Sequence, residues 1–213
     1  MSSTSSAPGD VGVKRTLGAL FDPAADLWVL ASQGLTGLTD GEYWWEPVAG
    51  CWSIRPRNEL VNPDDVTWGD SQWGLDIVYP DPQPAPFTTI AWRLAHMTGS
   101  VLAAAAVLRN RRLDDGGLDQ SWPHLRLLPL SASAAVDRWH TATGALREHL
   151  ADATDEDLES VVALGWSAPA PAWRHVHYLG YFEPASHAAE VRLIRDLYRA
   201  SDGGRAPLLP PRR

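Results

Sequence analysis

The sequence predicts an all-α protein: a four-helix bundle with a long, Trp/Pro-rich crossover loop between the first and second helices. Two observations support this fold class. Four stretches place apolar residues at the three- and four-residue spacing of one helix face. Residues 42–86 lack that spacing over a long span and are rich in aromatic, Pro and Asp residues. A bundle whose first two helices are joined by a long crossover accounts for both.

The first two predicted helices lie on either side of this loop. The first is expected over residues 13–34, but Pro23 falls inside it, so the helix starts late or is kinked there. The second follows the Pro-rich segment YPDPQPAPF and is expected over 90–110, with Thr88 or Thr89 as its N-cap.

The last two predicted helices complete the bundle. The third begins at the N-cap residue Ser131 and runs to about Leu150, and a short turn is expected over 155–160. The fourth is expected over 171–200, and the pair Gly203–Gly204 ends its pattern.

The crossover loop offers two short candidate strands. These are WSIRP, residues 52–56, and LDIVYP, residues 75–80. A loop of this length is uncommon in a compact domain and is often functional.

Composition limits the class of protein. The 213 residues suffice for one domain, expected over 13–202 between disordered tails at 1–12 and 203–213. A net charge of −8 argues against binding to nucleic acid or anionic membrane. No apolar run approaches the length needed to span a bilayer, and the N-terminus does not resemble a secretory signal. With Cys51 as the only cysteine, we expect a cytoplasmic monomer or homodimer that acts on a small molecule.

Among the seven histidines, His96 is the one that suggests chemistry. It lies in the middle of an apolar helical stretch, on the same face as Trp92 and Gly99. A lone histidine there is more often a hydrogen-bonded core residue than a metal ligand. His140 and His149 have no partner donor at a chelating spacing, His124 lies in a loop, and His175 and His177, two residues apart, project to different faces.

Glu183 and His187 form the second unusual feature. Four residues apart, they project from one helix face, and a carboxylate in such surroundings is rare unless it is paired or binds a metal. With His96 they would give three protein ligands, the pattern of a catalytic zinc-type site, and this donor set suits Zn²⁺, Ni²⁺ or Fe²⁺. Pro184 disfavours a regular helix here. The helix could break at this residue, or a kink or bulge could open beside the ligands.

Three segments together resemble the DinB-like superfamily. They are YWWEPVAGCWSIRPR, TTIAWRLAHM and EPASHAAEVRLIRDLYRA, and they are most similar to actinobacterial proteins related to mycothiol-dependent maleylpyruvate isomerase and mycothiol S-transferases. The resemblance implies a four-helix bundle that binds a divalent metal through His96, Glu183 and His187. Glu190 stands in the trailing position of the motif, where a hydrogen bond near the site and a surface ion pair are about equally expected. Ser186 and Pro184 depart from the motif.

This resemblance implies a metal-dependent enzyme that uses a thiol, most simply mycothiol, on a small electrophilic metabolite. A hydrolase or lyase that uses metal-bound water, or a metal-free bundle that binds a small molecule or a protein, remain alternatives. Arg55 and Arg57 are candidates for holding a carboxylate or the polar part of the thiol, and surface roles are equally open. Cys51 is interpreted as structural. The expected pocket walls, with core packing as the alternative for at least half of them, are Trp44, Trp45, Trp52 and Trp92.

Overall fold

The protein is mostly helical. A computed structural model describes residues 12, 27–64, 67–80, 82–109, 125–165 and 167–205. The expected first-helix residues 13–26, most of the tail at 1–12 and the tail residues 206–213 lie outside the described residues. In chain order the elements are α2 (Leu27–Leu35), α3 (Asp40–Trp44), β1 (Ile54–Pro56), η2 (Arg57–Glu59), β2 (Trp73–Leu75), α4 (Ile90–Arg109), α5 (Ala132–Asp152), α6 (Asp155–Glu159), β3 (Val161–Val162), β4 (Ala170–Pro171), α7 (Ala172–His177), η4 (Tyr178–Phe182) and α8 (Glu183–Ala200).

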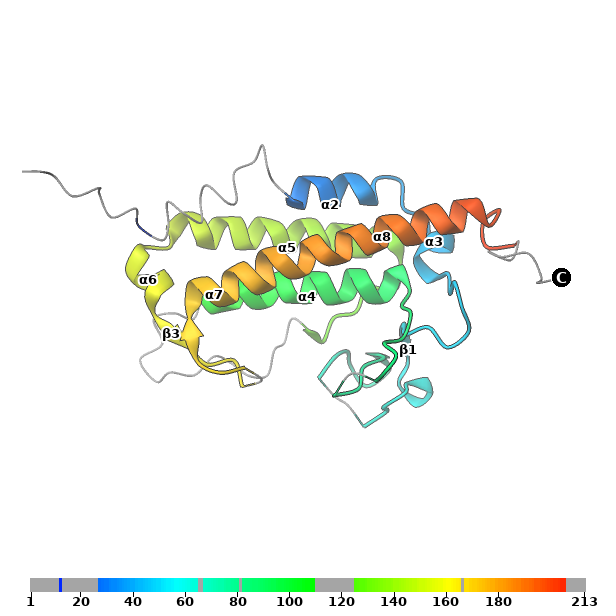
Figure 1. Ribbon diagram of the computed structural model, residues 1–213, viewed down its shortest axis with the longest axis horizontal. Helices are drawn as coiled ribbons and strands as arrows, with labels where there is room; N and C mark the ends of the chain where they lie inside the picture. The colour runs from blue at the N-terminus through cyan, green and yellow to red at the C-terminus, as the bar shows by residue number, and fades with distance from the viewer. Residues whose placement is uncertain are drawn as a thin grey trace, which may run out of the picture.

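Helix α4 is central to the packing. It contacts α5 along one side and α8, η4 and α7 along another, while α2 packs against α8 and α5 (Figure 1). The helices predicted over 90–110 and 131–150 are confirmed, and the turn predicted over 155–160 is α6. Two small antiparallel hairpins are also present: β1–β2, in the loop where two short strands were expected, and β3–β4, which was not predicted.

The predicted N-caps of α4 and α5 are also present. The Ser131 hydroxyl accepts a hydrogen bond from the backbone N–H of Ala134, and Thr89 Oγ1 accepts one from the backbone N–H of Trp92 at 3.2 Å. Each hydroxyl satisfies one of the N–H groups that the first turn of a helix leaves unpaired.

Helix α4 corrects an expectation about apolar length. By length and composition it could cross a membrane, although no apolar run was expected to approach that length. Most of its apolar window is buried inside the protein. The same pattern is found in the core helices of soluble proteins, and one such helix is weak evidence for a membrane span.

The crossover loop is organised around the buried carboxylate of Asp76. This carboxylate accepts hydrogen bonds from the backbone N–H groups of Ser53 and Val61 and from Arg55 Nε. The backbone carbonyl of Asp76 accepts the indole N–H of Trp92 at 2.6 Å, which ties the loop to α4. Of the two predicted strands, WSIRP contributes β1. The second strand, β2, ends at Leu75, so most of LDIVYP lies outside it.

The fourth predicted helix begins one residue later than Pro171 and continues through Pro184 without a break. Its middle turn, η4, is a π-helix in which the backbone N–H of Glu183 bonds to the carbonyl of Tyr178, five residues back. Pro184 has no N–H to offer the carbonyl of Gly180, and that carbonyl instead accepts the indole N–H of Trp28 at 2.7 Å. Of the two outcomes considered for Pro184, the structure has the bulge.

The end of this helix is as predicted. The helix stops at Ala200, and Gly203 and Gly204 follow it with φ of 65° and 80°, a backbone region that favours glycine. The N–H of Gly203 bonds back to the carbonyl of Tyr198 and so satisfies one carbonyl of the last turn.

Candidate metal centre

His96 lies between two indole rings. Trp92, one turn earlier on α4, stacks on the imidazole with ring centroids 4.8 Å apart and 13° between the planes. Trp68, from the crossover loop, stacks at 5.8 Å and 28°. Gly99 makes room for Trp68, since a Cβ at that position would lie 2.5 Å from the indole ring. The two rings restrict how the imidazole can turn, and they leave its Nε2 edge toward α8.

Glu183 and His187 approach this edge from α8. Glu183 Oε2 lies 3.2 Å from Nε2 of His96 and 3.1 Å from Nε2 of His187. One ligand atom from each of the three residues lies within 4.8 Å of the others. Two ligands that each bind a tetrahedral zinc ion at about 2.0–2.1 Å are themselves roughly 3.3 Å apart. The three side chains therefore converge at the spacing that a small divalent ion requires.

Both histidines influence the charge of Glu183. Their hydrogen bonds, first from His187 and then from His96, hold the pKa of the Glu183 carboxyl well below its usual range against the opposing effect of burial. Burial lowers the pKa of His96 despite its contact with Glu183. Burial also acts to lower the pKa of His187, but Glu183 and Glu190 outweigh it and the net shift is upward. An ionised Glu183 and a neutral His96 suit a metal ion, whereas His187, whose pKa is raised, would have to release a proton to bind one.

A second carboxylate orients His187. Glu190 Oε2 accepts a hydrogen bond from His187 Nδ1 at 2.7 Å and pairs with Arg93 Nε at 2.9 Å. In the neutral tautomer that keeps its proton on Nδ1, held by Glu190, the lone pair of Nε2 would face a metal ion, as in the carboxylate–histidine–metal arrangement common in zinc proteins. Both predicted roles of Glu190 are thus present, the hydrogen bond at the site and an ion pair, although its partner is Arg93 of α4.

The guanidinium groups of Arg55 and Arg57 are engaged by the protein itself. Arg55 binds Asp76 at 2.9 Å, Glu46 at 2.7 Å and the carbonyl of Cys51 at 2.7 Å. Arg57 donates to loop carbonyls, at 2.7 Å to that of Asp70. Both contacts hold the crossover loop together. The prediction that these two arginines hold a ligand stays a prediction.

The tryptophans predicted to wall a pocket separate into two groups. Trp92 stacks on His96 and packs near Trp52, with ring centroids 5.9 Å apart. Trp45 packs edge-on against Tyr198 at 5.5 Å, and Trp44 packs edge-on against Tyr43. Trp92 therefore contacts the candidate ligand His96, and Trp52 contacts Trp92. The ring contacts of Trp44 and Trp45 are with Tyr43 and Tyr198.

Cys51 is buried, and its thiol donates to the carbonyl of Val48. Burial raises the pKa of the Cys51 thiol, which agrees with a structural role.

Sequence reasoning missed two residues of the site, Trp68 and Arg93. Arg93 directly follows Trp92, so the spacing to His96 could have drawn attention to it. Trp68 lies in a loop with no periodicity, and no pattern in the sequence places it against α4.

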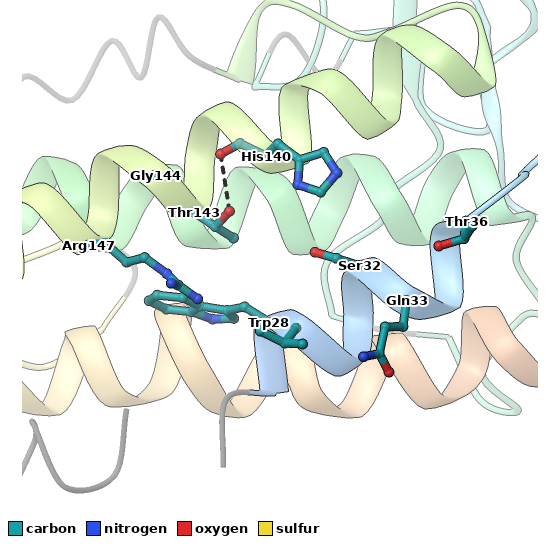
Figure 2. A pocket seen from close by; sticks show the side chains of 9 residues that line it. Trp28, Ser32, Gln33, Thr36, His140, Thr143, Gly144 and Arg147 are labelled. Atoms are coloured by element: carbon teal, nitrogen blue, oxygen red, sulfur yellow. Dashed lines mark hydrogen bonds between the residues drawn. The ribbon is translucent and has the colours of Figure 1, made fainter. Parts of the chain in front are cut away.

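The other histidines that the structure describes are not part of this cluster. Nε2 of His175 bonds to the carbonyl of Val162 at 3.0 Å, and His177 stacks on Tyr181. His140 lines a groove of about 520 Å³ between α2 and α5, where Arg147 lies over the ring of Trp28 (Figure 2). None of the three candidate metal ligands lines that groove.

Comparisons with known proteins find no matching family model, curated protein or solved structure. The interpretation of the site therefore depends on its own geometry and on the sequence motifs described above.

Proposed function

We propose that this protein is a metal-dependent enzyme with the DinB-like four-helix architecture, and that it uses a thiol to act on a small electrophilic metabolite. The observation that carries the proposal is the convergence of His96, Glu183 and His187, whose ligand atoms lie within 4.8 Å of one another. Two histidines and one carboxylate, with room for a further ligand, are typical of catalytic zinc sites.

Each of the three residues has a separate structural support. His96 is held between Trp92 and Trp68, and His187 is oriented by Glu190. Glu183 lies between the two imidazoles. Such supports restrict ligand movement and raise metal affinity. Zn²⁺ fits this donor set best, and Ni²⁺ and Fe²⁺ are also compatible with it.

The chemistry suits thiol activation. A divalent ion at this site would lower the pKa of a coordinated thiol and so supply a thiolate near neutral pH. The side chains of His96 and Glu183 are partly exposed, at 21% and 16%, which favours access from solution. The sequence resemblance supports mycothiol as the thiol, and a transferase or an isomerase as the class of enzyme.

The same exposure supports the alternative of a hydrolase or lyase, in which water takes the place of the thiol. Both candidates need the same three ligands and differ in whether the protein has affinity for a thiol. Binding of mycothiol to the metal-loaded protein is therefore the observation that separates them.

The experiment is a calorimetric titration of mycothiol into zinc-loaded protein and into protein stripped of metal. We expect saturable binding that requires the metal and is lost in His187→Ala. Zinc-loaded protein that shows no affinity for mycothiol, but hydrolyses activated esters or amides, would favour the hydrolase. A protein that binds mycothiol equally well without metal would contradict the proposed role of the site.

A further inference from the structure

Arg93 of α4 brings a positive charge to the candidate metal ligands. Its Nη1 lies 3.2 Å from Nδ1 of His187, and its Nε pairs with Glu190 at 2.9 Å. The guanidinium also lies over the ring of Trp92, 5.0 Å from the ring centroid, and that ring stacks on His96. Because Nε2 of His187 is the proposed ligand atom, one imidazole ring separates the fixed guanidinium from the place where the three ligands converge.

One amino group of this guanidinium is free to bind a ligand. Nε and Nη1 make the contacts above, while Nη2 has no hydrogen-bond partner in the described part of the chain. Nη2 is not buried either, since the buried side-chain atoms without a partner among the described residues are Nδ1 of His96 and Oγ1 of Thr98. With 19% of the Arg93 side chain exposed, the N–H donors of Nη2 can be reached from solution.

A positive charge in this position opposes the binding of a cation. Arg93 would repel a divalent ion held by the three ligands, and Glu190 offsets this repulsion only in part, because it pairs with one edge of the guanidinium. A side chain that works against one property of a site commonly serves another function there. Guanidinium groups match the geometry of carboxylates, so a guanidinium kept beside a cation site indicates that the site also receives an anion.

We propose that Arg93 binds the carboxylate of a substrate whose reactive carbon lies at the metal ion. The substrate is then a small electrophile that carries a carboxylate a few bonds from the carbon that the thiol attacks, since one imidazole ring separates the two positions. This inference rests on the proposed metal-dependent thiol chemistry and adds a binding subsite to it. Arg93 orients the substrate through its charge and its free donors and forms no bond to the reacting atoms.

The test uses two small thiols of the same length. Both β-mercaptopropionate and β-mercaptopropanamide can place sulfur on the metal, and they differ in offering Arg93 a carboxylate or a neutral amide. Each is titrated into cobalt-substituted protein, in which the absorption of the thiolate–cobalt bond reports binding at the metal. Zinc affinity is measured by competition with a chelator. The variants are Arg93→Gln, which removes the charge, and Arg199→Gln, a control on α8 whose side chain is 60% exposed.

We expect the wild type to bind the carboxylate about tenfold more tightly than the amide, as for a partly exposed hydrogen bond between charged groups. Arg93→Gln should lose this preference, while its zinc affinity stays the same or rises because a repelling charge is gone. Arg199→Gln should keep the preference. Comparing the two thiols within each variant cancels any general effect of the substitution on the metal.

A wild type that binds the carboxylate no more tightly than the amide would overturn the inference and leave the proposed function intact. The same holds for a preference that survives Arg93→Gln, or that disappears in Arg199→Gln as well. Loss of zinc binding in Arg93→Gln would also overturn the inference, because Arg93 would then support the metal ligands and not the substrate. Wild-type protein that binds zinc but neither thiol, or binds no zinc, would overturn the inference together with the proposed function.

Discussion

Replacing Glu190 with Gln tests how His187 is held. The carboxylate of Glu190 accepts from His187 Nδ1 at 2.7 Å and from Arg93 Nε at 2.9 Å. A hydrogen bond to a charged group contributes about 1.5–3 kcal/mol. The Glu190 side chain is 43% exposed, and solvent screening brings the expected loss of metal-binding free energy to the bottom of that range. About 1.4 kcal/mol corresponds to a tenfold change in the dissociation constant of the metal.

The assay is zinc affinity, measured by competition with a chelator of known affinity. Asp196→Asn is the matched control: it removes one negative charge from the same helix, and Asp196 is 74% exposed and pairs with Arg199 at 3.7 Å. We expect Glu190→Gln to weaken zinc binding about tenfold and Asp196→Asn to leave it nearly unchanged. Equal affinities for Glu190→Gln and wild type would refute the orienting role. Equal losses in both variants would mean that only the net charge of the helix matters.

Two further predictions concern the stability of the fold, one at the site and one at a buried ion pair. Gly99→Ala should push Trp68 away from His96, because the new Cβ would lie 2.5 Å from the indole. We expect a loss of about 1–3 kcal/mol in the free energy of unfolding, measured in urea. An unchanged midpoint of urea unfolding would contradict this packing. Glu42→Gln should cost about 3 kcal/mol, since it leaves Arg195 buried without its ionic partner. Burial acts to raise the pKa of Glu42, but hydrogen bonds from Arg195 and Thr39 outweigh it and leave the pKa lowered. The ion pair therefore stabilises the fold at pH values above the unfolded-state pKa of Glu42, and this stability is lost as pH falls through the lower folded-state pKa. The difference in unfolding free energy between wild type and Glu42→Gln should therefore shrink in acid. A difference that grows in acid would contradict this sign.

The helices expected over 90–110, 131–150 and 171–200 and the three candidate ligands could be predicted from the sequence, because their signals are local. Caps such as Ser131 and the four-residue spacing of Glu183 and His187 depend on the geometry of one helix. The partnership with His96 was inferred from its apolar surroundings and from the resemblance, since no spacing rule links residues on different helices.

The contacts that spacing does not encode could not be predicted. The pairing of Arg55 with Asp76 in the same loop depends on the hairpin register. Trp68 reaches His96 because Gly99 leaves space for it. The π-turn before Glu183 could not be predicted either, since Pro184 indicated only that the helix would be disturbed there.

Metal stoichiometry tests the central claim most directly. Zinc is titrated calorimetrically into protein stripped of metal, in parallel with the variants His96→Ala and His187→Ala. The convergence of His96, Glu183 and His187 predicts one tight site per chain in the wild type and its loss in both variants. Wild-type protein with no tight site, or variants that bind zinc as tightly as wild type, would contradict the account.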